Sequence, residues 1–187
     1  MKIGLVSAIL ADYGFEKMVD TVSELGFDCV EVACWPCGKA ERRYAGVSHI
    51  DVDELDEARR DYILDYCAQR KVEISSLAFY PNTLDGDPLK RAANVEHLKK
   101  VIRASAMLGV NMVTTFIGRD QTKTVEENLD LMCQVWPPIL KLAEELGVRD
   151  VRFEGKRNEY PIDDSSPSVV RDPNKCIQCR RCIAACG

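Results

Sequence analysis

The amino-acid sequence predicts an α/β protein in which helices cover a parallel β-sheet. Two observations lead to this fold class. Short apolar segments alternate four times with segments whose apolar residues recur at helical spacing, and turn or capping residues mark most of the helix ends. An open, doubly wound sheet and a segment of a (β/α)8 barrel share this pattern, so the spacing leaves both open. No Gly-x-Gly-x-x-Gly motif follows the first strand to favour a dinucleotide site.

The first two strand–helix units lie before residue 70. Residues 3–9 are apolar and strand-like, and a helical pattern then runs over residues 15–25 until Gly26 ends it. Residues 29–34 make the second strand. A long loop separates this strand from a helix that we expect over residues 53–69.

The third unit has the clearest helix start. Residues 72–80 make its strand, and Asp87 is placed to cap a helix whose first position is Pro88. A proline is tolerated there because the first helical N–H groups have no partner within the helix. This helix is expected to stop at Gly109.

The fourth unit begins with a strand over residues 110–116. Thr124 and Glu127 form a capping-box pattern that opens a helix reaching Leu142. Pro137 and Pro138 predict a kink or a break inside this helix, since proline removes a backbone donor and clashes with the preceding turn.

Length and charge restrict the possible functions. With 187 residues, 46% of them hydrophobic, the chain can bury one sizeable core and a small appendage. The net charge of -5 is uneven: residues 149–187 hold eight Lys or Arg against six Asp or Glu, so the preceding residues carry the acidic excess. An acidic body argues against nucleic-acid binding. No export signal or apolar stretch of about 18 residues is present, so we expect no membrane insertion, a cytoplasmic location and reduced thiols.

Residues 1–147 resemble the xylose-isomerase-like barrel family of sugar-phosphate isomerases and epimerases, which includes endonuclease IV-type repair enzymes. The passages that carry the likeness are Lys2 to Ala8, Cys34-Trp35-Pro36, Arg42-Arg43-Tyr44-Ala45-Gly46, Ser76 to Asn82, and Thr114 to Asp120. The resemblance implies a partial (β/α)8 TIM barrel of about four βα units. A whole barrel takes about 250 residues.

The resemblance also implies what this part of the chain does not supply. In the family, the ligands of a catalytic divalent metal and the carboxylates that transfer protons come mostly from later strands. We therefore assign no catalytic residue, expect no divalent metal of the barrel family, and expect no isomerase or epimerase activity from the chain alone.

Five residues in the predicted strand-to-helix loops are candidates for binding a sugar or sugar phosphate. They are Trp35, Arg42, His49, Tyr80 and Arg119. Basic groups there can hold a phosphate or sugar hydroxyls. The alternative for each is a solvated loop charge or a packing side chain, and a single histidine does not make a metal site.

Cys34-Trp35-Pro36-Cys37 has the Cys-x-x-Cys spacing of thioredoxin-like redox sites. Its context differs, because the motif continues into a basic loop that contains glycine rather than opening a helix. We interpret Cys34 as a thiol at a strand end and Cys37 as a loop cysteine.

The tail has different chemistry. Cys176, Cys179, Cys182 and Cys186 form the C-x2-C-x2-C-x3-C run of a ferredoxin-type [4Fe-4S] site, in which closely spaced thiolates reach separate iron atoms. Zinc binding or an idle remnant of such a site are the alternatives. Before this run, Val151 and Phe153 alternate with polar residues as in a half-exposed strand, and an irregular polar loop is expected over residues 156–172.

Residues 148–187 resemble the start of the two-cluster ferredoxin region of iron-only hydrogenases and of the NADH dehydrogenase large subunit. The likeness rests on Asp150 to Gly155, Tyr160 to Pro167 and the cysteine run. In that family Cys176, Cys179 and Cys182 would hold one cluster together with a cysteine of a second run, and Cys186 would serve the other cluster. The second run does not follow, so the resemblance implies an incomplete, labile cluster.

Two domains are therefore expected, a partial barrel over residues 1–147 and a truncated ferredoxin-type segment over residues 148–187. The passage from Leu142 to Val148 occurs in similar form in both families, which leads to the hypothesis of a chimera formed by recombination or by an assembly error. The candidate functions are an inactive isomerase-like fragment, an iron–sulfur electron carrier with a redox partner, and, third, a DNA-repair fragment. We also expect self-association through exposed strand edges.

Overall fold

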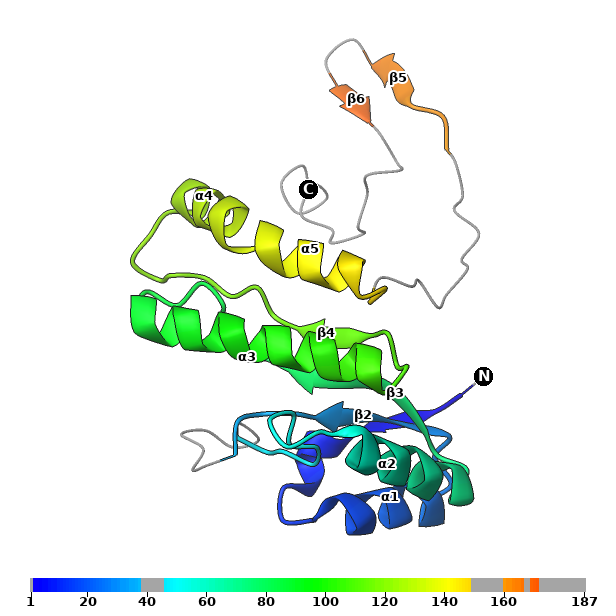
Figure 1. Ribbon diagram of the computed structural model, residues 1–187. Coiled ribbons are helices and arrows are strands. Elements are labelled where there is room, and N and C mark those ends of the chain that lie inside the picture. Colours follow the sequence, from blue (N-terminus) through cyan, green and yellow to red (C-terminus); the bar gives the residue numbers. More distant parts are fainter. Residues whose placement is uncertain (1, 38–45, 149–159, 167–168, 172–187) are drawn as a thin grey trace. The chain divides into compact units, whose positions relative to one another are not determined.

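The computed structural model describes residues 2–37, 46–148, 160–166 and 169–171 of the chain. It divides into two compact units, residues 1–150 and 151–187. In its described residues the first unit contains four strands, one 3-10 helix and five α-helices (Figure 1). In chain order they are β1 (Gly4–Val6), η1 (Ser7–Leu10), α1 (Phe15–Glu24), β2 (Cys29–Ala33), α2 (Glu57–Gln69), β3 (Glu73–Phe79), α3 (Pro88–Met107), β4 (Val113–Thr115), α4 (Val125–Val135) and α5 (Pro137–Glu145).

The four strands form one parallel sheet in the order β1-β2-β3-β4. Each strand is therefore followed by a helical connection to its next neighbour, as the sequence pattern predicts. The register shifts between Val30 and Glu31, so that Val30 pairs with Ile74 whereas Glu31 pairs with Ser76. This irregularity aligns Glu31 with Ser76 and leaves Ser75 as the extra residue of β3.

Three of the described α-helices, α2, α3 and α4, begin at residues whose side chains cap them. The side chain of Asp87 accepts a hydrogen bond from the backbone N–H of Leu89 at 2.9 Å, at the start of α3. Thr124 and Glu127 complete the capping box of α4, with hydrogen bonds of 3.2 and 2.8 Å. The predicted break at the two prolines is confirmed, because α4 ends before Trp136 and α5 starts at Pro137.

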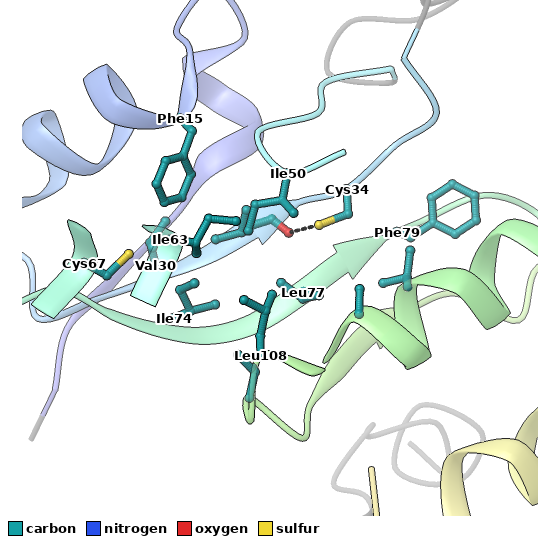
Figure 2. Close-up of a cluster of buried hydrophobic side chains, with 14 of the residues drawn as sticks. Phe15, Val30, Cys34, Ile50, Ile63, Cys67, Ile74, Leu77, Phe79 and Leu108 are labelled. Atoms are coloured by element: carbon teal, nitrogen blue, oxygen red, sulfur yellow. Dashed lines mark hydrogen bonds between the residues drawn. The ribbon is translucent and has the colours of Figure 1, made fainter. Parts of the chain in front are cut away.

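One face of the sheet packs against the helices and forms the core. Val30 and Val32 of β2 and Leu77 and Phe79 of β3 are almost completely buried on this face. Figure 2 shows these strands beside Phe15, Ile63 and Leu108, and the Cys34 thiol donates to the carbonyl of Val32 at 3.5 Å. We call this helix-covered side the outer face of the sheet and the opposite side the inner face.

Several expectations from the sequence differ from the structure in detail. The fourth strand spans Val113–Thr115 rather than residues 110–116. The first strand is shorter than residues 3–9, because the chain turns into the 3-10 helix η1 after Val6. The second helix begins at Glu57 rather than near residue 53, because Asp56 is its N-cap and accepts from the Arg59 N–H at 2.7 Å.

The second unit contains an antiparallel pair of strands, β5 (Asp163–Ser166) and β6 (Val169–Arg171). A hairpin thus occupies part of the segment that we expected to be an irregular loop. The predicted strand around Val151 and Phe153 lies outside the described residues. Within the described part of the chain, no helix is both long and apolar enough to cross a membrane.

Candidate functional site

A cluster of polar side chains lies on the inner face of the sheet. The carboxylate of Glu31 accepts hydrogen bonds from Ser76 Oγ at 3.0 Å, from Thr114 Oγ1 at 2.7 Å and from the Tyr80 hydroxyl. Thr114 Oγ1 and Ser76 Oγ are themselves 3.0 Å apart. These four residues are called the inner-face cluster below.

The strand register assembles this cluster. Glu31 pairs directly with Ser76 across β2 and β3, and Thr114 pairs with Ala78 across β3 and β4. Tyr80 follows the last residue of β3, so its hydroxyl reaches back to Glu31 from the carboxyl end of the sheet. Three neighbouring strands thus contribute polar groups from their middle residues, and Tyr80 connects them to the carboxyl end of the sheet, where ligands bind in parallel α/β folds.

Burial and hydrogen bonding keep the Tyr80 phenol in its protonated form. Burial and the hydrogen bond to Glu31 raise the pKa of Tyr80 to about 12. The phenol therefore stays protonated near neutral pH, where an acid of such high pKa is a poor proton donor in catalysis. The arrangement holds one carboxylate and three hydroxyl groups in fixed positions.

Apolar groups border the cluster. The ring of Phe116 lies 4.8 Å from that of Tyr80, between centroids, and Phe116 is 61% exposed. On the other side Val6, which pairs with Glu31, is 44% exposed. Small-molecule sites commonly combine a few fixed polar groups with apolar walls, so this part of the inner face has the composition of a ligand site.

The predicted sugar-binding residues that the structure describes lie in different environments. Tyr80 belongs to the inner-face cluster, whereas Trp35 packs edge-on against Phe79 with ring centroids 5.2 Å apart. Arg119 is exposed, and its backbone carbonyl accepts from Asn82 Nδ2 at 2.8 Å. Arg42 lies outside the described residues.

His49 is buried and makes hydrogen bonds through both ring nitrogens. Nδ1 lies 3.1 Å from Ser7 Oγ, and Nε2 lies 3.2 Å from the carbonyl of Leu10. Ser7 Oγ also accepts from the Ala33 N–H at 2.8 Å, so His49 joins the ends of β1 and β2. Burial lowers the pKa of His49. Sugar binding by His49 stays a prediction, and its contacts here are structural.

Both thiols of the Cys-x-x-Cys segment are held in their protonated form. Burial raises the pKa of Cys34 far above its usual range, and a hydrogen bond to Asp51 raises that of Cys37. The Cys37 thiol donates to Asp51 Oδ2 at 3.2 Å. Because thiol exchange requires a thiolate, this geometry favours the interpretation of both cysteines as non-redox residues.

The loops beside the site are joined tightly. Thr83 Oγ1 donates to the carbonyl of Ile117 at 2.7 Å, and a Cβ at Gly118, which has φ of +78°, would lie 1.9 Å from Asn82 Oδ1. Only glycine fits this crossing of the loop after β3 and the loop after β4. The crossing fixes the carboxyl ends of both strands next to the cluster.

Three members of the inner-face cluster were not identified as site residues from the sequence. The available signal was a polar residue inside a strand: Glu31 in Cys-Val-Glu-Val-Ala, its partner Ser76 in β3, and Thr114 in β4. Such residues are costly to bury unless they are paired, so three of them in adjacent strands indicate a shared network.

Metal chemistry has no candidate in the described residues. They contain no group of three or more His, Cys, Asp or Glu side chains able to hold a metal ion. The predicted cluster ligands Cys176, Cys179, Cys182 and Cys186 lie outside the described residues.

Comparison with known proteins supports two separate likenesses. The curated protein named NADP-reducing hydrogenase subunit HndD, from Solidesulfovibrio fructosivorans, is 42% identical over 46 residues. This match covers 25% of the present chain but 8% of the hydrogenase subunit. It agrees with the hydrogenase resemblance inferred from the tail.

Solved structures of sugar epimerases and isomerases share the fold of the larger part. D-psicose 3-epimerase from Clostridium cellulolyticum H10 matches with a TM-score of 0.55 and 16% identity, over 79% of this chain and 50% of that protein. A putative xylose isomerase from Rhodospirillum rubrum matches with a TM-score of 0.59 and 16% identity, over 79% of this chain and 51% of that protein. A D-tagatose 3-epimerase-like protein matches with a TM-score of 0.57 and 20% identity, over 80% of this chain and 51% of that protein.

The present chain spans about half the length of these proteins. At sequence identities this low, the comparison shows a shared fold and nothing further. The family model described as xylose isomerase-like TIM barrel matches residues 19–152, which is well over half of the sequence. The parallel order of β1 to β4 and the helices between them agree with that match. The chain therefore belongs to the xylose isomerase-like TIM barrel family.

Proposed function

We propose that residues 1–147 form part of a barrel that binds a polyhydroxylated ligand of the ketose class at the inner-face cluster. The observation that carries this proposal is the Glu31 carboxylate with its three hydroxyl donors on the inner face of the sheet. A carboxylate has about four acceptor positions, so it retains capacity for a ligand hydroxyl, and the three hydroxyl oxygens can accept as well.

The choice of a ketose follows from the fold relatives. Solved structures with this fold include a D-psicose 3-epimerase with D-tagatose and another in the presence of D-fructose. In the present chain, the exposed Phe116 ring and Val6 would contact the carbon skeleton of such a ligand, while the cluster would bind its hydroxyl groups.

We further propose that one chain binds such a ligand without isomerising it. The described residues contain no group of three or more His, Cys, Asp or Glu side chains able to hold a metal ion, and the family resemblance places the metal ligands and the proton-transferring carboxylates mostly on later strands. A sensitive chromatographic assay for conversion of D-fructose or D-tagatose should find no product. Conversion above that of a buffer control would overturn this part of the proposal.

Calorimetric titration with D-fructose and D-tagatose tests the ligand site. Replacing Tyr80 with Phe should weaken binding about fivefold, because a neutral hydrogen bond contributes about 1 kcal/mol. Glu31→Gln should weaken it roughly tenfold or more, since bonds to a charged group are stronger. Tyr62→Phe is the matched control, because it removes a hydroxyl that donates to Glu16 at 3.0 Å on the helix surface. Equal losses in the control and in Tyr80→Phe would reject the site.

A second function is proposed for the tail. We propose that residues 148–187 form a ferredoxin-type segment in which Cys176, Cys179, Cys182 and Cys186 hold a labile [4Fe-4S] cluster. The spacing of the four cysteines and the match to a hydrogenase subunit support this proposal. A bound cluster would supply one-electron transfer to a redox partner, in a compartment that keeps thiols reduced.

Anaerobic reconstitution with iron and sulfide tests the cluster. We expect about four iron and four sulfide per cluster and a charge-transfer absorption that fades in air. Cys179→Ser should reduce the iron content strongly, whereas Cys133→Ser, which changes an exposed thiol of α4, should leave it unchanged. Zinc in place of iron, or equal iron in both variants, would contradict the proposal.

A further inference from the structure

The hydroxyl protons of the inner-face cluster have defined directions. A hydroxyl group carries one proton, and an ionised carboxylate carries none. Ser76 Oγ and Thr114 Oγ1 donate to Glu31 Oε2 at 3.0 and 2.7 Å. The Tyr80 hydroxyl donates to Oε1 of the same carboxylate. All the hydroxyl protons of the cluster are therefore directed at Glu31.

Other acceptors compete weakly for these protons. Thr114 Oγ1 lies 2.7 Å from Glu31 Oε2. Its distances to Ser76 Oγ and to the Leu77 carbonyl are longer, at 3.0 and 3.5 Å. A hydrogen bond to an ionised acceptor is about twice as strong as one between neutral groups. A hydroxyl that turned toward a neutral ligand acceptor would lose the stronger bond, so we expect the protons to stay on Glu31 when a ligand binds.

The remaining hydrogen-bonding positions of the cluster are acceptors. A carboxylate offers about four acceptor positions. Two hydroxyl groups donate to Glu31 Oε2 and one to Oε1, which leaves about one free position, on Oε1. The hydroxyl oxygens of the cluster also keep lone pairs. A ligand group that hydrogen-bonds here must therefore donate a proton, as a sugar hydroxyl does and an ionised carboxylate or phosphate oxygen does not.

A second negative charge is disfavoured at the same place. Burial and the hydrogen bond to Glu31 raise the pKa of Tyr80 to about 12, so an anionic phenolate is unfavourable beside this carboxylate. Ser76 is buried and Thr114 is half-buried, so water screens charges here less than on an open surface. A ligand anion in contact with Glu31 would meet the same repulsion.

We propose that Glu31 determines the specificity of the ketose site, by making it an acceptor-only subsite that selects neutral polyhydroxylated ligands over sugar acids and sugar phosphates. This inference rests on the proposed binding of a ketose and adds which chemical feature is recognised. A ligand carbonyl contributes little to the contact, because the cluster has no hydroxyl proton left for it. Specificity of this kind combines contacts with the right ligand and a penalty against the wrong one.

Calorimetric titration with a sugar alcohol and a sugar diacid of equal chain length tests this specificity. D-sorbitol has a hydroxymethyl group at each end, whereas D-glucarate has a carboxylate at each end, so neither orientation of D-glucarate removes the terminal charge. D-fructose is titrated in the same series as the reference ligand. Wild type should bind D-sorbitol within about tenfold of D-fructose, and roughly tenfold or more tighter than D-glucarate.

Three variants separate specificity from affinity. Glu31→Gln keeps the shape of the side chain, removes its charge and adds N–H donors. It should reduce the preference for D-sorbitol over D-glucarate roughly fivefold or more, although it also weakens D-sorbitol binding. Tyr80→Phe keeps the carboxylate, so it should weaken D-sorbitol binding and retain the preference. Glu16→Gln is the matched control, because Glu16 accepts from the Tyr62 hydroxyl at 3.0 Å on the helix surface and the substitution changes the net charge equally.

The outcomes distinguish this inference from the proposed function. If wild type does not bind D-fructose, the ketose site itself is wrong, and its specificity with it. If D-fructose binds but D-glucarate binds as tightly as D-sorbitol, only the acceptor-only subsite is overturned. The same holds if D-sorbitol fails to bind, if the preference is unchanged in Glu31→Gln, or if Glu16→Gln changes it equally. Far-UV circular dichroism checks that the variants fold, and the wild-type preference and Tyr80→Phe decide the question if Glu31→Gln does not.

Discussion

At the scale of single residues, the inner-face cluster shows how one charged side chain is accommodated in an apolar strand. Glu31 is placed between Val30 and Val32, and both valines point into the core. The opposite face supplies the hydroxyl groups of Ser76 and Thr114, which hydrogen-bond the carboxylate. Glu31 therefore stays on the inner face as a fixed acceptor, at the expense of the packing that an apolar side chain would give there.

His49 makes the stability of the fold depend on pH. Burial lowers the pKa of His49, so the folded chain keeps the imidazole neutral while the unfolded chain takes up a proton near pH 6.5. The stabilisation is therefore present above about pH 6.5 and is lost as pH falls through the lowered pKa. We expect the free energy of unfolding in urea to fall between pH 7 and pH 5 in wild type, and less steeply in His49→Gln.

The carboxylates act in a different pH range. The pKa values of Asp20 and Asp120 are lowered, by the hydrogen bond from Arg70 and by that from Thr122 respectively. Their stabilisation is lost below about pH 4, outside the range chosen for His49. Identical slopes between pH 7 and pH 5 in wild type and His49→Gln would show that His49 does not titrate in this way.

At the scale of elements, helix ends were predicted well where the sequence supplies a capping residue. Asp87 and Thr124 cap α3 and α4 as expected, and the two prolines separate α4 from α5. The start of α2 was placed near residue 53, whereas Asp56 caps the helix in the structure. The 3-10 helix after β1 was missed, because the apolar run to Ile9 also fits a strand.

The capping box of α4 gives a prediction at this scale. Thr124→Ala should lower the free energy of unfolding by about 1 kcal/mol, because the Glu127 N–H loses its side-chain acceptor. Val125→Ala, at the next position and largely exposed, should change it by less than about 0.5 kcal/mol. Urea denaturation of both variants is the measurement. Equal effects would indicate that the cap contributes nothing beyond local packing.

At the scale of the whole molecule, the order of strands and helices was predictable because each unit repeats one pattern. The site was only partly predictable. Tyr80 was proposed from its place after a strand, but its partners depend on the register shift between Val30 and Glu31, which no local pattern reveals. Trp35 and His49 occupy loops of the expected kind, yet their side chains contact the core and the strand ends. Position in a loop therefore identified candidate binding residues, and their contacts in the structure show which of them belong to the inner-face cluster.

Binding of a ketose at the inner-face cluster can be followed by titrating D-fructose into protein that carries ¹³C at the tyrosine Cζ atoms and recording NMR spectra. We expect the Tyr80 signal, assigned with Tyr80→Phe, to shift saturably while the signal of Tyr62, which donates to Glu16 on the helix surface, stays constant. An unchanged Tyr80 signal at saturating sugar, or equal shifts of both tyrosines, would contradict it.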